Sequence, residues 1–515
     1  MTEVTSYEDV QYQSKPHYPM HADCLGTLGH LFGMRPAPAG RCRVLELGCA
    51  TAMNVICMAE ALPESEFVGL DLSPSQIAAG QQLVDAAGLK NVRLQAASIM
   101  DVDESWGKFD YILSHGVFSW VPTFVQDKLF EICRSLLTPQ GIAYLSYNTY
   151  PGWHQRTVVR EMMQYHTALL TEPRERIQQA RAVLNFFAKS VPDKTTPYAR
   201  FLIDEAKSLD DSPDSYVFHE HLEENNQPLY FHQFMERASA HGLQYVSEAW
   251  QHLQLDDLPS EVGQSLQGIS RDLIQLEQYA DFLTNRTFRR TLLCHADVEL
   301  DRSPSVEAIR PLFVTALAQP FSADPDVRST AEEQLKLDSG AIVRVNLPIV
   351  KAALVRAYRA WPNAVPFEQL CEESLADIAD PATNREQQRA LLAAALLRGH
   401  LSHFVALHRE RFRFCTQVSE RPAVALLTRK LAAHQSLVPN RRHTSASYSP
   451  AERLLLMLAD GTRNQRDLLR DFAAARAENI SASDEALLPA QNVEDLAGWI
   501  DSTLQQFGRQ ALLIS

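Results

Sequence analysis

The stretch from Arg43 to Leu72 constrains the fold more than any other part of the chain. It opens with the apolar run Val44–Leu47, which ends at Gly48. An amphipathic pattern of helical period follows, and a second apolar run, Phe67–Leu70, stops at the acid Asp71. Strand, tight turn, helix and strand in this order form a βαβ unit, whose two strands are parallel. The chain is therefore expected to contain an open α/β sheet.

The turn after the first run has the composition of a ligand-binding turn. Gly48 has no Cβ, so a ligand can approach its backbone. The helix that begins near Ala52 directs its N-terminal N–H groups to the same place, which suits a carboxylate or a phosphate. Asp71, about 20 residues further on, can accept hydrogen bonds from both hydroxyls of a ribose. These features predict a nucleoside or nucleotide ligand where the first two strands end.

Strands and helices alternate after Asp71. We expect further strands at 92–98, 109–115 and 142–147, with helices at 73–87 and 125–137 between them. This alternation predicts a parallel, doubly wound sheet that binds its ligand at the carboxyl ends of the strands. The residues that fall at those ends are Gly48, Asp71, Ser98, His115 and Asn148.

The length of 515 residues predicts about three domains. We expect an N-terminal flap and helix at 1–40, the α/β domain at 41–298 with a helical insertion at about 155–225, a winged-helix-like α+β domain at 299–420, and a mostly helical domain at 421–515. A short strand is predicted at Arg411–Cys415. The basic cluster of Arg441, Arg442 and His443 is interpreted as a solvated loop.

The net charge of −15 argues against general nucleic-acid binding, which needs a basic surface. The eight cysteines are scattered without a C-x-x-C pair, so neither a disulfide framework nor a zinc site is indicated. His219, Glu220 and His221 are interpreted as structural hydrogen-bonding groups, and no metal is expected. The acidic N-terminus is unlike a signal peptide and no apolar run reaches ~18 residues. We therefore predict no membrane span and a cytoplasmic location.

The turn Glu46–Ala52 lacks the G-x-G-x-x-G fingerprint of phosphate binding. It resembles the E/D-x-G-x-G-x-G motif of class I S-adenosylmethionine-dependent methyltransferases, with Ala50 and Ala52 in place of two glycines. The segments YQSKPHYPMH, RVLELGCATAMN, SHGVFSWVP, YNTYPGW and RTFRRTLLCH resemble one bacterial family in particular. These are the methyltransferases with a methyltransferase regulatory domain, a group that includes the rickettsial protein-lysine methyltransferases.

The resemblance implies S-adenosylmethionine as methyl donor and S-adenosylhomocysteine as product. The residues expected to bind this cofactor are Glu46, Gly48, Ala50, Asn54, Asp71, Leu72, Ser98, Ile99 and His115. The catalytic candidates are His115, Tyr147 and Asn148. An acceptor amine must be neutral, and a desolvated aromatic channel disfavours its charged form. The aromatic residues expected to line such a channel are Tyr12, Tyr18, Phe118, Trp120, Tyr150 and Trp153.

The leading hypothesis for function is N-methylation of lysine side chains in a protein substrate. One alternative is methylation of a small amine, phenol or hydroxyl compound in a biosynthetic pathway. A second alternative is a non-catalytic module that senses the cofactor or binds a partner. The large additional domains favour a macromolecular acceptor, and they could equally form a homodimer.

Overall fold

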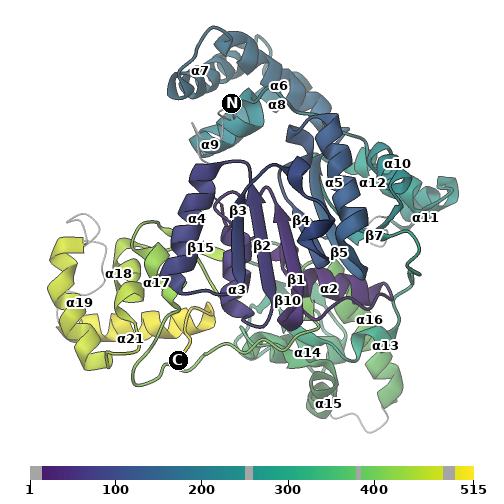
Figure 1. Ribbon diagram of the computed structural model, residues 1–515. Coiled ribbons are helices and arrows are strands. Elements are labelled where there is room, and N and C mark those ends of the chain that lie inside the picture. Colours follow the sequence, from purple (N-terminus) through teal and green to yellow (C-terminus); the bar gives the residue numbers. More distant parts are fainter. Residues whose placement is uncertain (1–13, 250–258, 379–383, 480–492) are drawn as a thin grey trace.

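The structure is a computed structural model that describes residues 14–249, 259–378, 384–479 and 493–515. A seven-stranded sheet forms its centre, with the strand order β3-β2-β1-β4-β5-β7-β6 (Figure 1). Strands β1 to β5 are parallel, and β7 is antiparallel to both of its neighbours. The predicted doubly wound α/β sheet is thus confirmed. The strands are β1 (Arg43–Leu47), β2 (Glu66–Asp71), β3 (Val92–Ala96), β4 (Phe109–Ser114), β5 (Leu137–Asn148), β6 (Leu243–Glu248) and β7 (Phe288–His295).

Helices cover both faces of the sheet, because successive side chains of a strand point to opposite faces. Val44 of β1 packs into the core on one face, and Leu45 packs into the core on the other. The helices of the first face are α2 (Ala22–Leu31), α3 (Met53–Ala61) and α4 (Pro74–Ala87). Those of the second face are α5 (Thr123–Leu136), α10 (Phe231–Ala240) and α12 (Leu273–Thr284), while α11 (Ser260–Ile269) precedes α12.

A helical insertion separates β5 from α10 along the chain. It has its own apolar core, which includes Val159, Leu184 and Leu202. In Figure 1 it lies above the sheet, at the edge where the parallel strands end. Its elements are α6 (Gly152–Thr167), α7 (Pro173–Ser190), α8 (Pro197–Asp210), α9 (Asp214–Val217) and the π-helical turn η6 (Phe218–Leu222).

The middle domain is built around a strand flanked by two others. Strand β8 lies between β12 and β13 and is antiparallel to both. A hairpin of β10 and β11 precedes three helices, as expected of a winged-helix-like fold. The elements are α13 (Val306–Ile309), β8 (Phe313–Ala316), β9 (Gln319–Pro320), β10 (Glu333–Lys336), β11 (Ile342–Val345), α14 (Pro348–Arg359), β12 (Val365–Pro366), α15 (Phe367–Ile378), α16 (Arg385–Leu401) and β13 (Val405–His408).

The last domain repeats this order of elements. Ala423 pairs with Asp460 and Val424 pairs with Leu513, so the segment 423–424 takes the central place that β8 has in the middle domain. A hairpin of β14 and β15 again precedes helices, of which the described residues contain α18, α19 and α21. The elements are α17 (Leu426–Ala432), β14 (Leu437–Pro439), β15 (Ser445–Ser447), α18 (Pro450–Leu458), α19 (Gln465–Asn479) and α21 (Val493–Arg509). The domain is thus mostly helical, as predicted, and it also contains a hairpin and two isolated strand pairings.

Two local predictions were wrong. The strand expected at Arg411–Cys415 is absent from this described segment, and β13 lies a few residues earlier. All four residues of β13 are buried against β8, whereas 411–415 alternates arginine with phenylalanine along a loop. The cluster 441–443 is not a solvated loop, since His443 is buried. Among the described residues, none of the helices combines the length and apolar character needed to cross a bilayer.

Candidate functional site

The turn after β1 has the backbone of a ligand-binding loop. Gly48, Ala50 and Ala52 all have left-handed conformations, with φ of +75°, +50° and +58°. The N–H of Gly48 donates to the carbonyl oxygen of Leu70, which ties the turn to β2. A Cβ added at Gly48 would lie 2.4 Å from Cγ2 of Val117. Glycine is therefore required at position 48 by both backbone angle and space.

Asp71 ends β2 beside this turn. Its Oδ2 accepts a hydrogen bond from the Ala50 N–H over 2.7 Å, and its Oδ1 accepts one from the Ser73 N–H over 2.9 Å. A carboxylate offers about four lone-pair positions, so an acid of this kind can hold a turn and also accept hydrogen bonds from a ligand. The chemistry fits a ribose, whose two hydroxyls need a shared acceptor.

Glu46 and Asn54 lie beneath the turn as buried polar side chains, 5% and 3% exposed. Oε2 of Glu46 and Nδ2 of Asn54 make no hydrogen bond to any residue that the structure describes. Burial raises the pKa of the Glu46 carboxyl to about 8, and the nearby Asn54 side chain and Val55 backbone oppose that shift. A carboxyl and an amide N–H of this kind suit the ammonium and the carboxylate of an amino acid.

Residues 14–20, the described part of the predicted flap, lie against this pair. The backbone N–H of His17 donates to Oδ1 of Asn54 over 3.2 Å. The His17 ring lies 4.3 Å from the ring of His115, whose Nδ1 is 2.9 Å from Oη of Tyr144. Burial lowers the pKa of His17 to about 4 and the pKa of His115 well below its usual range. Both imidazoles are therefore neutral at physiological pH.

The other cofactor candidates gather at the ends of β2 and β3, where Asp71 pairs with Ala96. The side chain of Leu72 is 56% exposed at this edge. Ile99 packs partly into the core beside it. Ser98 caps a short helical turn, because its Oγ accepts the N–H of Met100 over 3.2 Å. The structure thus brings the predicted cofactor residues to one edge of the sheet.

Asn148 ends β5 at the same edge. Its N–H donates to Oγ of Ser119 over 2.9 Å, and its Nδ2 donates to Oδ1 of Asn226 over 3.0 Å. The amide group is thereby held with Nδ2 toward Asn226, so Oδ1 projects from the other side. Tyr150 follows, with its ring 4.0 Å from His154 and 5.3 Å from Tyr230.

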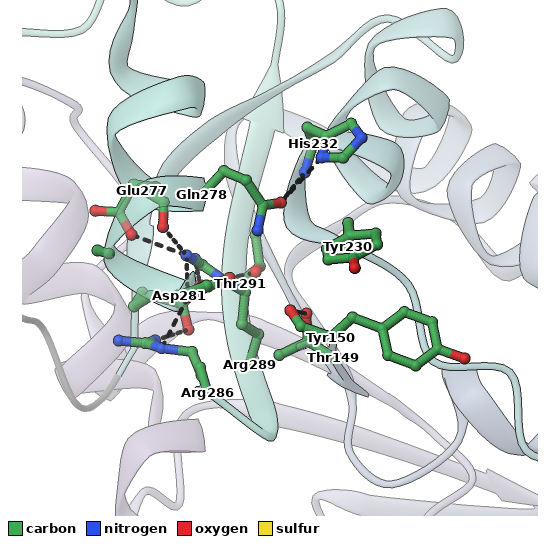
Figure 2. A network of polar contacts seen from close by, with 12 residues as sticks. Thr149, Tyr150, Tyr230, His232, Glu277, Gln278, Asp281, Arg286, Arg289 and Thr291 are labelled. Carbon is green, nitrogen blue, oxygen red and sulfur yellow. Dashed lines mark hydrogen bonds and ion pairs between the residues drawn. The ribbon is translucent and has the colours of Figure 1, made fainter. Parts of the chain in front are cut away.

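A buried charge network fixes the sheet edge behind these aromatic rings (Figure 2). Arg289 of β7 is fully buried and bonds Asp281 and Glu248, each over 2.8 Å. In Figure 2 Arg289 lies beside Asp281, with Tyr230 and Tyr150 to one side. Gln278 of α12 accepts the backbone N–H of His232. This contact of α12 anchors the start of α10, next to Tyr230.

Three predicted active-site aromatics lie in the core instead. Phe118, Tyr147 and Trp153 are at most 1% exposed. Tyr147 stacks on Phe234 at 4.0 Å, and its hydroxyl bonds Oγ1 of Thr291 over 3.1 Å. Side chains enclosed in this way have no open face for an acceptor, so their placement contradicts the predicted catalytic role of Tyr147 and the substrate roles of Phe118 and Trp153. Trp120 packs its ring 6.3 Å from Trp153 and remains partly exposed.

Two further predictions concern the N-terminal tyrosines and the histidines of the insertion. Tyr18 faces the middle domain, with its ring 6.5 Å from His408, which does not fit an acceptor channel. Tyr12 lies outside the described residues. Nδ1 of His219 is 3.1 Å from Oε1 of Glu223, a structural contact as expected. Within the described ranges, no group of three or more His, Cys, Asp or Glu side chains is arranged to hold a metal.

Two residues that sequence reasoning missed lie against Asn54. His17 belongs to the segment YQSKPHYPMH, which carried the family resemblance and could have indicated it. His443 comes from the last domain, and its Nε2 lies 2.6 Å from Oδ1 of Asn54. The sequence around His443 gave no such signal.

Three family models match the chain. A model described as a methyltransferase domain covers residues 39–190, and one described as a predicted methyltransferase regulatory domain covers 213–295. A model described as the C-terminal winged helix domain of PKMT covers 420–512. The winged-helix match thus falls on the last domain, which the sequence predicted to be mostly helical.

Proteins of rickettsiae resemble the chain over most of its length. An uncharacterized protein of Rickettsia prowazekii is 35% identical over 524 residues, which cover 99% of this chain and 93% of that protein. The solved structure of PKMT2 from Rickettsia typhi superposes with a TM-score of 0.86 and 31% identity, covering 98% of this chain and all of that one. The structure of PKMT2 in complex with AdoHcy gives a TM-score of 0.85.

Proposed function

Because the chain belongs to the family of S-adenosylmethionine-dependent methyltransferases with a regulatory domain and a PKMT winged-helix domain, we propose that it methylates lysine side chains of a protein substrate. The observation that carries this proposal is the match to PKMT2, a protein lysine methyltransferase by name, over the whole chain. The likeness includes both additional domains, which methyl transfer to a small molecule does not require.

When bound, S-adenosylmethionine supplies a methyl group activated by the sulfonium. In our proposal, Glu46 and Asn54 hold its amino-acid part through their buried polar atoms. Asp71 accepts the ribose hydroxyls beside the turn of Gly48 and Ala50. The residues that flank the adenine are Leu72, Ser98 and Ile99. The fixed turn and the buried polar groups place the donor without rearrangement, which lowers the entropic barrier to transfer.

The acceptor lysine must present a neutral amine, because only the lone pair can form the new N–C bond. We assign Oδ1 of Asn148 to accept an N–H of this amine and so orient the lone pair. The rings of Tyr150, His154 and Tyr230 flank the approach. An apolar approach disfavours the charged ammonium and thus lowers the pKa of the lysine.

His115 has a different role in this proposal from the general base that the sequence allowed. Burial lowers its pKa well below the usual range, so it is a poor acceptor for a lysine proton. We assign it instead to the cofactor side, where it packs against His17. The proton leaves the amine for solvent before the transfer.

A labelled-donor experiment tests the acceptor class. The purified chain is incubated with methyl-labelled S-adenosylmethionine and a bacterial lysate, and the label is separated into protein and small-molecule fractions. The Asp71→Ala variant serves as control, since it removes the ribose acceptor. We expect label in a protein band with the parent chain and much less with the variant when the donor concentration is limiting. Label confined to small molecules would contradict a protein substrate, and the absence of any transfer would contradict catalysis.

A further inference from the structure

The last domain reaches into the cofactor site through its hairpin. His443 lies in the turn between β14 and β15, 389 residues from Asn54 in sequence. Its Nε2 is nonetheless 2.6 Å from Oδ1 of Asn54, and the side chain is 3% exposed. A residue of the C-terminal domain is thus in direct contact with a residue that faces the cofactor.

The turn that presents His443 is held in shape by its own hydrogen bonds. Oδ1 of Asn440 accepts the backbone N–H groups of Arg442 and Thr444, over 3.0 and 3.1 Å. The N–H of His443 donates to the carbonyl oxygen of Asn440, and His443 has a φ of +62°. A left-handed conformation is uncommon for a residue with a Cβ, and such residues concentrate at functional sites.

The neighbouring residue anchors the turn to the middle domain. The guanidinium of Arg442 lies over the ring of Trp361 at 4.0 Å, and its Nη1 donates to the carbonyl oxygen of Pro362 over 2.6 Å. The His443 ring in turn lies 5.1 Å from the ring of His21. The hairpin is therefore fixed between the N-terminal segment and the middle domain, with His443 directed at Asn54.

Hydrogen-bond directions determine how Asn54 is oriented. The backbone N–H of His17 can only donate, so the group of Asn54 that faces it must be the oxygen. The same oxygen faces Nε2 of His443, which must therefore carry the proton. Burial lowers the pKa of His443 well below its usual range, with His21 and His17 adding to the shift, so the ring is neutral and has a single N–H.

The opposite end of the amide is consequently directed to the side of the buried Glu46 carboxyl, where the proposed cofactor site lies. With Oδ1 held by two donors, Nδ2 of Asn54 points away from them, and it makes no hydrogen bond within the described part of the chain. It is a buried donor beside the turn of Gly48, where the cofactor carboxylate is assigned.

We propose that His443 is a positioning residue for the cofactor, which fixes the Asn54 side chain so that its Nδ2 donates to the carboxylate of S-adenosylmethionine. The last domain thereby completes the cofactor site rather than only adding a separate surface. This inference rests on binding of the cofactor and is independent of which acceptor is methylated.

Calorimetric titration of the full chain with S-adenosylmethionine tests this role. His443→Ala should weaken binding by about three- to tenfold, the effect of one lost hydrogen bond. His443→Gln keeps an N–H donor and should bind within about twofold of the parent chain. In an Asn54→Ala background, His443→Ala should cause no further loss, because the two residues act through one contact. Ser447→Ala, on the exposed side of the same hairpin, is the matched control.

Several results would overturn the proposal. One is an unchanged affinity of His443→Ala for S-adenosylmethionine. Another is an equal loss of affinity in His443→Gln and His443→Ala. A third is that His443→Ala weakens binding in the Asn54→Ala background as much as it does in the parent chain. Thermal unfolding of each variant without cofactor checks that it folds. If His443→Ala does not fold, the affinity of His443→Gln for S-adenosylmethionine tests the proposal instead. A loss of affinity in His443→Gln as large as the loss in Asn54→Ala would contradict the positioning role. Failure to methylate protein with normal cofactor affinity would instead contradict the proposed function.

Discussion

The carboxylate of Asp71 and the backbone N–H of Ala50 are joined by a hydrogen bond of 2.7 Å. The acid therefore shapes the turn, and we propose that it also accepts the ribose hydroxyls. Asp71→Ala should lower the affinity for S-adenosylmethionine about a hundredfold, because hydrogen bonds to a charged group are among the stronger ones. Calorimetric titration measures this, with the exposed acid Asp103 changed to alanine as control. Equal affinity of Asp71→Ala and the parent chain would contradict the assignment.

The raised pKa of the Glu46 carboxyl predicts that it releases a proton when the cofactor binds. Burial raises its pKa to about 8, so the folded chain without cofactor holds a proton there that the unfolded chain loses near the usual value of 4.5. The stability due to this protonation is full below the unfolded pKa and is lost as the pH rises through about 8. The ammonium of the cofactor favours the ionised carboxylate, so binding below pH ~8 should expel the proton.

The release is measured by titration at about pH 6.5 in buffers of different ionisation enthalpy, where the α-amino group of the cofactor is already protonated. We expect close to one proton per bound cofactor in the parent chain and almost none in Glu46→Gln. The same release in both chains would show that the proton comes from another group.

The substitution Ala50→Gly is expected to stabilise the folded chain, which is unusual for a change to glycine. The φ of +50° at Ala50 costs a residue with a Cβ about 1–2 kcal/mol, whereas glycine adopts this angle freely. Ala50→Gly should therefore stabilise the folded chain by about 0.5–1 kcal/mol, after allowance for the greater freedom of glycine when unfolded. Thermal unfolding measures the change. Ala59→Gly, inside α3, should destabilise by about 1 kcal/mol, and a decrease in both variants would refute the idea that the turn is strained.

Substitutions of Asn148 should change the rate of methyl transfer without changing the affinity for the cofactor. Asn148→Ala removes the proposed acceptor for the amine N–H, so the rate of methyl transfer should fall about ten- to a hundredfold. The dissociation constant for S-adenosylmethionine should stay within about twofold, since the proposed contact is to the acceptor. Asn148→Asp keeps an oxygen at this position and should retain more activity than the alanine variant. A parallel loss of cofactor affinity would place Asn148 in the donor site instead.

The sheet and the cofactor turn could be predicted because their signals are local in sequence. The apolar runs, Gly48 and Asp71 all fall within Arg43–Leu72, and one βαβ unit sets their relative positions. The backbone angles at the turn could not be predicted, because nothing in the sequence distinguishes an alanine that adopts a left-handed conformation.

The aromatic residues near the strand ends show where sequence reasoning stopped. Tyr147 and Asn148 are adjacent in β5, but successive side chains point to opposite faces, so a shift of one residue exchanges core and site. The sequence shows which residues are aromatic, but it does not show which face of the sheet each side chain occupies. Trp153 was expected to contact the acceptor, but its 1% exposure makes it a core residue. Its replacement by alanine would mainly lower the stability of the fold.

The contact between His443 and Asn54 lies beyond what one sequence can show. The two residues belong to different domains, and the basic cluster 441–443 has the composition of an exposed loop. Burial of Arg442 and His443 depends on aromatic partners such as Trp361 and on the packing of three segments of the chain. Only the folded arrangement brings them together.

Peptide mapping by tandem mass spectrometry tests the proposed reaction most directly. Protein that the chain has labelled with S-adenosylmethionine is digested, and the modified side chain is identified from its fragments. We predict that the added methyl groups reside on lysine Nζ, and that Asp71→Ala strongly reduces them at the same concentration of S-adenosylmethionine. Methyl groups found only on other side chains, or identical labelling by parent and variant, would contradict lysine methylation at this site.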